Sequence, residues 1–194
     1  MCSRYNAYLV VDEAHAVGVS GRGRGMVQEL GLQDEVFARV VTFGKALGCH
    51  GAAVLGHIKL RDYLVNFARS FIFTTGLPPH ALATVLAAYN QLAGDVSAQN
   101  GLREIIGFFS SEAERLGLGC FINSTSAIHC AVVPGTIKVK AISTALQERG
   151  FDVRAILSPT VPAGQERLRF CLHSYNTKQQ VTTVLTHFRE LLHQ

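Results

Sequence analysis

The chain has 194 residues, which is enough for one large domain or two modest ones. Hydrophobic residues make up 48% of the chain and charged residues 16%, so we expect a substantial buried core and exclude a disordered chain. The formal net charge is +4, and the basic residues are scattered rather than clustered. This diffuse charge argues against nucleic acid as a partner, although it suits an anionic ligand.

The cysteines and the apolar runs indicate the compartment. Five cysteines lie far apart and form no C-x-x-C pair (Cys2, Cys49, Cys120, Cys130 and Cys171). An odd number without a framework predicts reduced thiols in a cytoplasmic protein. No apolar run approaches the roughly 18 residues of a membrane span, so we expect no membrane partner. The first residues resemble no secretion signal and pass directly into a strand-like run, which indicates a truncated chain.

The first half of the chain alternates between expected strands and helices. Residues 8–11 predict a buried parallel strand that ends in the polar group Asp12-Glu13-Ala14-His15, and a glycine-rich loop follows over residues 18–25. Residues 39–42 and 52–55 predict two more strands, joined by a turn at residues 44–48. Further elements are expected as a helix over 60–68, a strand over 71–74 and a long helix over 79–94.

The composition shifts after about residue 95. A helix is expected first, over residues 97–116. Strands are then expected over 128–133, 151–156 and 168–172, and helices over 138–149 and 177–192. This order predicts an α/β fold in two parts, with an α/β part over residues 1–95 and a smaller α+β part over residues 96–194.

The group Asp12-Glu13-Ala14-His15 allows three interpretations. It matches the D-E-A-H sequence of nucleic-acid helicases, but the chain lacks the G-x-x-x-x-G-K-[ST] loop that such enzymes need, so a helicase fragment stays only as an alternative. A carboxylate at the end of a strand is well placed to meet a ligand, and pyridoxal phosphate (PLP) needs one to keep its pyridine nitrogen protonated. His15 could then bond the phenolic oxygen of PLP. A strand-end salt bridge with a surface histidine is the third interpretation.

Lys45 lies between Gly44 and the pair Ala46-Leu47 that precedes Gly48, directly after an expected strand. Glycines make the backbone permissive there and allow a ligand to approach closely. Partial desolvation would favour the neutral amine, which forms imines and moves protons. Thr42, three residues earlier, could offer its hydroxyl to a phosphate. An ordinary exposed lysine in a turn is the alternative.

Two further segments could bind anions. Thr74 and Thr75 precede the start of the expected helix over 79–94, where hydroxyls and backbone N–H groups together suit an anion, with simple helix capping as the alternative. Arg167 and Arg169 lie on one face of an expected strand, where one of them could clamp a carboxylate. A surface pair on an edge strand is the alternative there. The eight histidines show no metal-binding spacing.

Together these motifs resemble those of the α-oxoamine synthases, PLP-dependent enzymes of fold type I. The resemblance covers nearly the whole chain and implies a mostly parallel sheet with helices, followed by a small α+β domain. It rests on five motifs in order: Asp12-Glu13-Ala14-His15, Gly23-Arg24-Gly25, Thr42-Phe43-Gly44-Lys45, Phe73-Thr74-Thr75-Gly76-Leu77-Pro78-Pro79, and Pro159-Thr160-Val161-Pro162 leading into Arg167-Leu168-Arg169.

The resemblance implies a role for each matching residue of the cofactor site. Lys45 would hold PLP as a Schiff base and, once released by the substrate, remove the Cα proton of the amino acid. Asp12 would pair with the pyridine nitrogen and His15 with the phenolic oxygen. Thr42 would bind the phosphate of its own site.

The remaining matches imply a partner subunit and substrates. Thr74 and Thr75 resemble threonines that reach the phosphate of the neighbouring subunit, which implies a homodimer with shared active sites. Thr160 and Arg169 match positions that face the substrate, with Arg169 on the carboxylate of the amino acid. The substrates implied are an amino acid and an acyl-CoA or acyl-carrier-protein thioester.

Within the family, Gly51-Ala52-Ala53 after the Lys45 turn resembles the branch that joins L-alanine to a pimeloyl thioester in biotin biosynthesis. Glycine C-acetyltransferases and 5-aminolevulinate synthases usually carry a Gly-Gly-Tyr-like sequence there, and they remain alternatives together with serine palmitoyltransferase. A non-catalytic binding protein with a PLP fold is a further alternative. About half of a usual subunit is absent, so we expect weak PLP binding and exposed apolar surface at residues 8–11 and 71–73.

Overall fold

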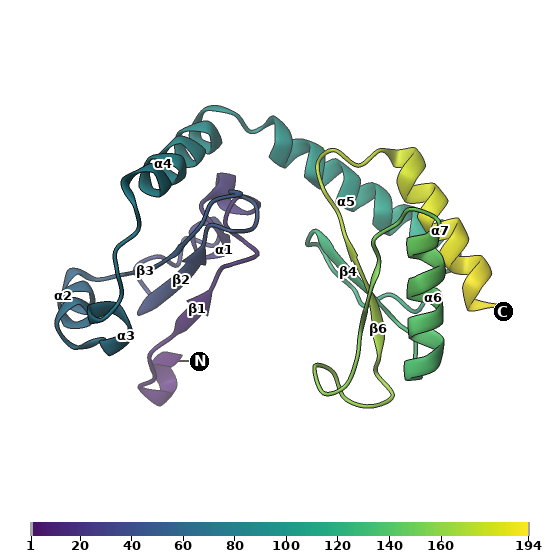
Figure 1. Ribbon diagram of the computed structural model, residues 1–194, viewed down its shortest axis with the longest axis horizontal. Helices are drawn as coiled ribbons and strands as arrows, with labels where there is room; N and C mark the ends of the chain where they lie inside the picture. Colours follow the sequence, from purple (N-terminus) through teal and green to yellow (C-terminus); the bar gives the residue numbers. More distant parts are fainter. Residues whose placement is uncertain (1, 194) are drawn as a thin grey trace. The chain divides into compact units, whose positions relative to one another are not determined.

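The computed structural model describes residues 2–193. The chain divides into two compact units, the first ending at Gln99 and the second beginning at Asn100. Each unit combines a small sheet with helices, so the α/β class predicted from the sequence is confirmed (Figure 1).

The first unit contains a three-stranded sheet in the order β1-β2-β3. Its elements are η1 (Cys2–Tyr5), β1 (Val10–Asp12), η2 (Gly21–Gly23), α1 (Met26–Glu29), β2 (Ala38–Thr42), β3 (Ala52–Gly56), α2 (Ile58–Phe67), α3 (Arg69–Ile72) and α4 (Pro79–Gly94). Strand β1 pairs with β2 in parallel, whereas β3 pairs with β2 antiparallel. The short connection between β2 and β3 explains the antiparallel pair, because a parallel pair needs a longer crossover.

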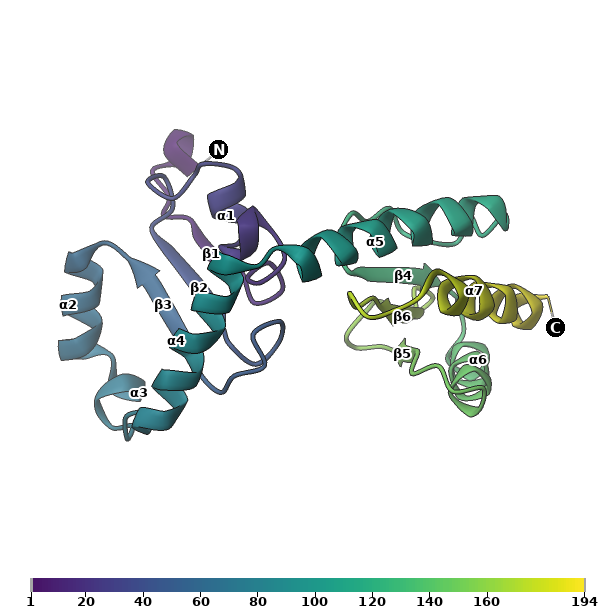
Figure 2. The same cartoon turned by 90° about the horizontal axis from the view of Figure 1, so that it is seen from above.

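The core of this unit lies between the sheet and α4. Buried residues from the turns and strands form one cluster (Val17, Val41, Phe43 and Cys49), and it packs against side chains of α4 (Val85, Ala88 and Tyr89). Figure 2 shows β1, β2 and β3 side by side, with α4 running across them. Edge-to-face contact between Phe43 and Tyr89, with ring centroids 6.2 Å apart, joins the end of β2 to α4.

The strand predicted over residues 71–74 is wrong. Residues Arg69–Ile72 form the short helix α3, in which the N–H of Phe73 donates to the carbonyl of Arg69 at 3.1 Å. The Phe-Ile-Phe-Thr run has the β-branched and aromatic residues of a strand, but a strand also needs a neighbour to bond with. Local backbone bonds satisfy this segment instead, and its aromatic side chains stay exposed.

The apolar exposure expected at residues 8–11 and 71–73 is confirmed for most of them. Tyr8 is 80% exposed and Phe73 78%, and the side chains of Leu9, Val10 and Phe71 are also exposed. Helices α2, α3 and α4 contain no buried residue. The first unit therefore leaves several large apolar side chains exposed, as surfaces that bind partners do.

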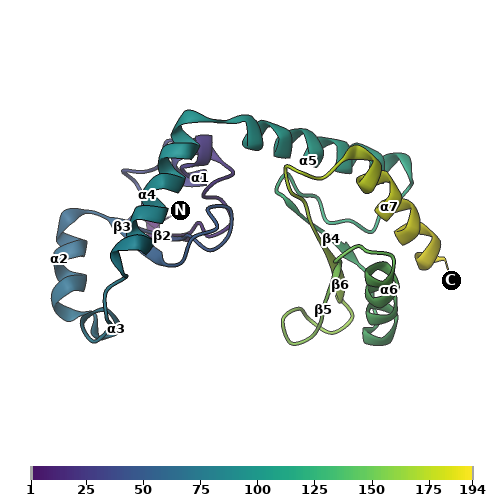
Figure 3. The same cartoon turned by 45° about the horizontal axis from the view of Figure 1, so that its top comes forward.

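The second unit contains a sheet in the order β4-β6-β5, with both pairings antiparallel. Its elements are α5 (Ser97–Arg115), which begins just before the unit, β4 (Ile128–Val132), α6 (Thr136–Glu148), β5 (Arg154–Ile156), β6 (Arg167–Cys171) and α7 (Lys178–Leu192). All these elements lie within a few residues of their predicted bounds. Figure 3 shows α6 and α7 beside the strands of this sheet.

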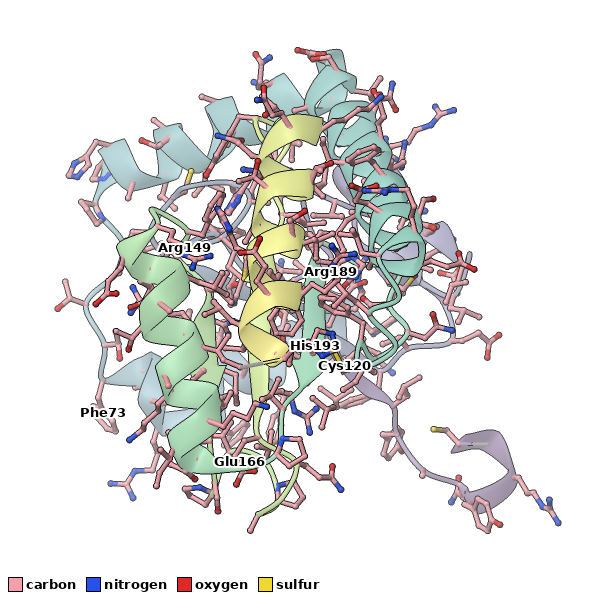
Figure 4. The ribbon with its side chains drawn as sticks, turned by 90° about the vertical axis from the view of Figure 1, so that its right-hand side faces the viewer. Phe73, Cys120, Arg149, Glu166, Arg189 and His193 are labelled. Atoms are coloured by element: carbon pink, nitrogen blue, oxygen red, sulfur yellow. The ribbon has the colours of Figure 1, made fainter. Side chains whose placement is uncertain are left out.

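The helices cover one face of this second sheet. In β6, Leu168 and Phe170 are buried, while Arg169 and Cys171 between and after them are exposed. The buried side chains meet an aromatic cluster whose ring centroids lie 5.3 to 5.8 Å apart (Phe109, Phe121, Phe170 and Phe188). Figure 4 shows α5, α6 and α7 side by side over the strands. On the opposite face, called the open face below, the side chains of β4 and β6 are exposed or partly exposed.

Two devices fix the ends of these helices. Thr177 and Gln180 form a reciprocal capping box at the start of α7. Near the start of α6, Glu166, which is labelled in Figure 4, accepts the N–H of Gly135 at 3.0 Å and that of Gly164 at 3.2 Å. These backbone hydrogen bonds hold the pKa of Glu166 below its usual value.

Candidate functional site

The parallel pairing of β1 and β2 brings two predicted site residues to the same edge of the sheet. Asp12 ends β1 and Thr42 ends β2. The register places Asp12 opposite Val40, two residues before Thr42 and five before Lys45. Because ligands of α/β proteins bind at the carboxyl ends of parallel strands, this edge is the natural place for a site.

Asp12 and His15 flank the first turn after β1. An Oδ1 atom of Asp12 accepts the N–H of Ala14 at 2.9 Å, and its side chain is otherwise exposed. The N–H groups of Ala16 and Val17 donate to the carbonyl of Glu13 at 2.9 and 3.0 Å, which closes the turn. His15 is exposed on this turn. Both candidate cofactor ligands therefore face outward from a fixed backbone.

Glu13, between them, has a different role. It is 1% exposed and forms a buried ion pair with Arg39, whose Nε donates to Oε2 at 2.6 Å. The N–H of Val27 donates to the other carboxylate oxygen at 2.7 Å. A helicase needs this carboxylate for Mg²⁺ and water, and here both of its oxygens are occupied within the protein. No sequence motif indicates this pair, because Arg39 lies on another strand.

Backbone hydrogen bonds close the turn that carries Lys45. The N–H of Phe43 donates to Gly51 at 2.9 Å, that of Cys49 to Phe43 at 2.7 Å and that of Gly48 to Lys45 at 3.0 Å. Phe43 and Cys49 are buried in the core, whereas Lys45 is exposed. Among residues 2–193 its ammonium has no hydrogen-bond partner. The backbone of this turn is thus fixed, and the amine of Lys45 that it carries is exposed and available to a ligand.

The hydroxyl group of Thr42 lies in an environment that suits a bound ligand. Its Oγ1 atom is buried and has no hydrogen-bond partner within the described part of the chain. A buried hydroxyl left without a partner costs about 1–3 kcal/mol, so such groups usually meet a ligand, a water or a neighbouring side chain. The hydroxyl fits the phosphate-binding role expected from the sequence.

In the part of the chain that the structure describes, Thr74 and Thr75 are not hydrogen-bonded to the residues at the carboxyl ends of β1 and β2. The hydroxyl of Thr74 donates to the carbonyl of Ser70, and both threonines are exposed. In the described residues they make no hydrogen bond to Asp12, Thr42 or Lys45. The segment is nevertheless near the Lys45 turn, since a Cβ at Gly51 would lie 3.0 Å from Cδ1 of Leu77.

Thr160 and Arg169 belong to the second unit. Thr160 is exposed in the connection between β5 and β6, shortly after a cis peptide bond before Pro159. Arg169 lies on the open face of the sheet, opposite Cys130 on one side and Arg154 on the other. Strand β6 is central, so the alternative of an edge-strand pair is wrong.

The neighbouring arginines differ from Arg169 in their partners. Arg154 is paired with Asp152 at 2.5 Å, and Arg167 donates from Nε to the carbonyl of Gln165 at 3.1 Å. Arg169 makes no hydrogen bond or ion pair among the residues that the structure describes. Of these three arginines, Arg169 is therefore the one whose guanidinium has all of its N–H donors available to bind an anion.

Two further features are absent from the described residues. None of their helices combines the length and apolar character needed to cross a membrane. Residues 2–193 also contain no group of three or more His, Cys, Asp or Glu side chains placed to hold a metal ion.

Comparison with known proteins shows relatives that extend beyond this chain. The 8-amino-7-oxononanoate synthase of Emericella nidulans is 45% identical over 191 residues, which cover 93% of this chain and 45% of that protein. The enzyme of the same name from Anaeromyxobacter dehalogenans is 40% identical over 193 residues, covering 99% of this chain and 48% of its own. The chain therefore spans about half the length of the curated relatives it matches.

Solved structures match the fold over almost the same range. An 8-amino-7-oxononanoate synthase from Francisella tularensis has a TM-score of 0.85 and 30% identity, covering 94% of this chain and 54% of that one. A serine palmitoyltransferase from S. paucimobilis, solved with bound PLP and myriocin, has a TM-score of 0.88 and 27% identity, covering 98% and 48%. A family model described as aminotransferase class I and II matches residues 1–188. The chain belongs to this aminotransferase class I and II family, and the resemblance expected from its sequence is confirmed.

Proposed function

We propose that the chain forms the Lys45-bearing half of a PLP-dependent α-oxoamine synthase that joins L-alanine to a pimeloyl thioester. The products would be 8-amino-7-oxononanoate, CO₂ and the free thiol of CoA or of acyl-carrier protein, as in biotin biosynthesis. The curated relatives named 8-amino-7-oxononanoate synthase, at 40% and 45% identity, support this choice of substrates.

One observation carries the proposal. Strands β1 and β2 are paired in parallel, with the exposed carboxylate of Asp12 at the end of one strand and the unpartnered hydroxyl of Thr42 at the end of the other, three residues before the exposed Lys45. A ring nitrogen, a phosphate and an aldehyde need these three groups respectively. The presence of these three groups supports PLP as the ligand.

Bound PLP supplies an electron sink for the charge that develops on the amino-acid Cα. Lys45 would remove the Cα proton and return a proton after CO₂ has left. Asp12 would hold a proton on the pyridine nitrogen, His15 would orient the phenolic oxygen, and the hydroxyl of Thr42 would donate to the phosphate. The exposed positions of Asp12, His15 and Lys45 leave them accessible for these tasks.

The second unit would hold the substrate. Arg169 would bind the carboxylate of L-alanine through two N–H donors, a geometry that a planar guanidinium favours. The absence of any protein partner for Arg169 among the described residues supports this role. Thr160, exposed in the connection before β6, would face the same substrate.

The assembled protein would be a cytoplasmic homodimer with shared sites. Thr74 and Thr75 would reach the phosphate of the neighbouring subunit, a role that their exposed positions allow. Residues 1–95 would belong to the PLP-binding large domain and residues 96–194 to the small domain. The exposed apolar side chains of α2 and α3 would be covered in that assembly.

The test is deuterium exchange at Cα. The PLP-treated chain in D₂O should exchange the Cα proton of L-alanine faster than that of L-serine or glycine, and Lys45→Ala should abolish the exchange. Lys59→Ala, which removes an exposed lysine of α2, is the matched control. Faster exchange of L-serine would favour a serine palmitoyltransferase, since one such structure shares the fold. PLP binding without any exchange would indicate a non-catalytic binding protein.

A further inference from the structure

The glycine-rich loop after β1 touches the turn that carries Lys45. A Cβ at Gly18 would lie 2.4 Å from the Cβ of Ala46, closer than two such atoms can approach. Gly18 also has φ +84°, a conformation that side-chain-bearing residues rarely adopt. Its bare backbone therefore lies directly against the residue that follows Lys45.

The loop cannot easily retreat from this contact. The N–H of Gly18 donates to the carbonyl of Gly23 at 2.9 Å, and Val17 forms an antiparallel bridge with Arg24. The N–H of Gly25 donates to Ser20 at 3.0 Å, which closes the loop on itself. These bonds make residues 17–25 one compact piece of backbone.

The far side of the loop is fastened to the sheet. A Cβ at Gly25 would lie 2.6 Å from the carboxylate of Glu13, so the loop backbone is pressed against the buried ion pair. Arg39, the partner in that pair, also donates to the carbonyl of Arg24 at 2.6 Å. On the near side, Val17 is buried in the same cluster as Phe43 and Cys49. The loop is thus held at both ends.

We propose that Gly18 is a positioning residue for Lys45. The anchored loop supports Ala46 from one side, while backbone hydrogen bonds and the buried Phe43 and Cys49 hold the turn from the other. Any side chain at position 18 would push Ala46 away and move Lys45 with it. The chemical role of Lys45 rests on the proposed function. The contact by which the loop supports the Lys45 turn does not.

A methyl exchange across the contact tests this positioning role. Gly18→Ala introduces the clash with Ala46, and the double variant Gly18→Ala with Ala46→Gly removes it again while keeping the strained φ. Ala46→Gly alone removes only the methyl group. Gly31→Ala is the matched control, because Gly31 has φ +66° and nothing within 4 Å of its added Cβ.

The first readout needs no cofactor. Amide hydrogen exchange of Gly48 and Cys49, whose N–H groups close the turn, should become at least about tenfold faster in Gly18→Ala. The double variant should return to within about threefold of the parent, and Gly31→Ala should not change these two amides. Equal loosening in Gly18→Ala and Gly31→Ala, or no rescue in the double variant, would overturn the proposal.

The second readout links the contact to the cofactor. After PLP treatment and borohydride reduction, the pyridoxyl label on Lys45 should drop in Gly18→Ala and recover in the double variant. If amide exchange follows the expected pattern but the parent carries no label on Lys45, the proposed function fails and the positioning role stands. If the parent is labelled and amide exchange does not respond, the positioning role fails alone.

Discussion

Glu13 and Arg39 form a buried ion pair that ties three parts of the first unit together. The carboxylate of Glu13, at the end of β1, accepts from Arg39 in β2 at 2.6 Å and from the N–H of Val27 in α1 at 2.7 Å. Arg39 also donates to the carbonyl of Arg24 in the glycine-rich loop. Asp12 and His15 stand on either side of this anchor, so the pair fixes the backbone that presents both.

Replacing Glu13 with Gln should therefore destabilise the first unit. Removing one partner of a buried ion pair leaves the other charge uncompensated, which costs about 3–5 kcal/mol. Amide hydrogen exchange of the β1 and β2 peptides measures this loss. Asp62→Asn is the control, because Asp62 and Arg61 form an exposed pair worth less than about 1 kcal/mol. Equal effects of the two substitutions would show that the buried pair does not anchor the unit.

The positions of Asp12 and Glu13 show what could and could not be predicted from the sequence. The position of Asp12 at a strand end followed from the apolar run before it. The burial of Glu13 did not, because it depends on Arg39, which is 26 residues away on the neighbouring strand. A four-residue motif gives the chemical groups but not which of them faces the solvent.

Long periodic segments were predicted better than short ones. The helix over 79–94 has the expected bounds, and the strands of the second unit begin and end within a few residues of the prediction. The strand over 71–74 failed because strand-like composition cannot supply a neighbouring strand, and α3 satisfies its backbone locally. The contact of Gly18 with Ala46 could not be predicted from the sequence either, because it joins two separate turns.

Asp12→Asn should bind PLP yet lose Cα deprotonation. Without the carboxylate the pyridine nitrogen would not stay protonated, and the ring would accept charge poorly. We expect Cα deuterium exchange of L-alanine to fall by several powers of ten, each worth about 1.4 kcal/mol of barrier. Asp34→Asn, which changes an exposed aspartate of the same unit, should exchange like the parent. Exchange at nearly the parent rate in Asp12→Asn would remove Asp12 from the mechanism.

Arg169→Ala should weaken the binding of L-alanine. Hydrogen bonds to a charged group contribute about 1.5–3 kcal/mol, so the concentration for half-maximal exchange should rise about 10- to 100-fold. Arg154→Ala is the matched control, because Arg154 faces the same open side of the sheet but is paired with Asp152. A larger effect of Arg154→Ala would show that Arg154, and not Arg169, binds the carboxylate of L-alanine.

The stability of the second unit should fall in mild acid because of His129. Burial lowers the pKa of this histidine from its usual value of 6.5, while a backbone hydrogen bond at Ser126 raises it by less. The folded protein therefore favours neutral His129. The resulting stability is complete above about pH 6.5 and is lost as the pH falls below it, by at most about 1.4 kcal/mol per pH unit.

His129→Phe should remove this dependence, because a phenyl ring can pack beside Phe109 but cannot take up a proton. Urea unfolding at about pH 7.5 and about pH 5.5 gives the difference for each protein. His173→Asn, which replaces an exposed histidine, should keep the difference seen in the parent. An unchanged difference in His129→Phe would mean that other groups cause the acid sensitivity.

Borohydride reduction, which fixes a Schiff base permanently, shows whether Lys45 is the residue that binds PLP. The protein is treated with PLP, reduced, digested and mapped by mass spectrometry. We expect one pyridoxyl group on Lys45, none in Lys45→Ala and an unchanged label in Lys59→Ala. Label on Lys59 or Lys138 in place of Lys45, or no label on any lysine, would show that Lys45 does not hold the cofactor.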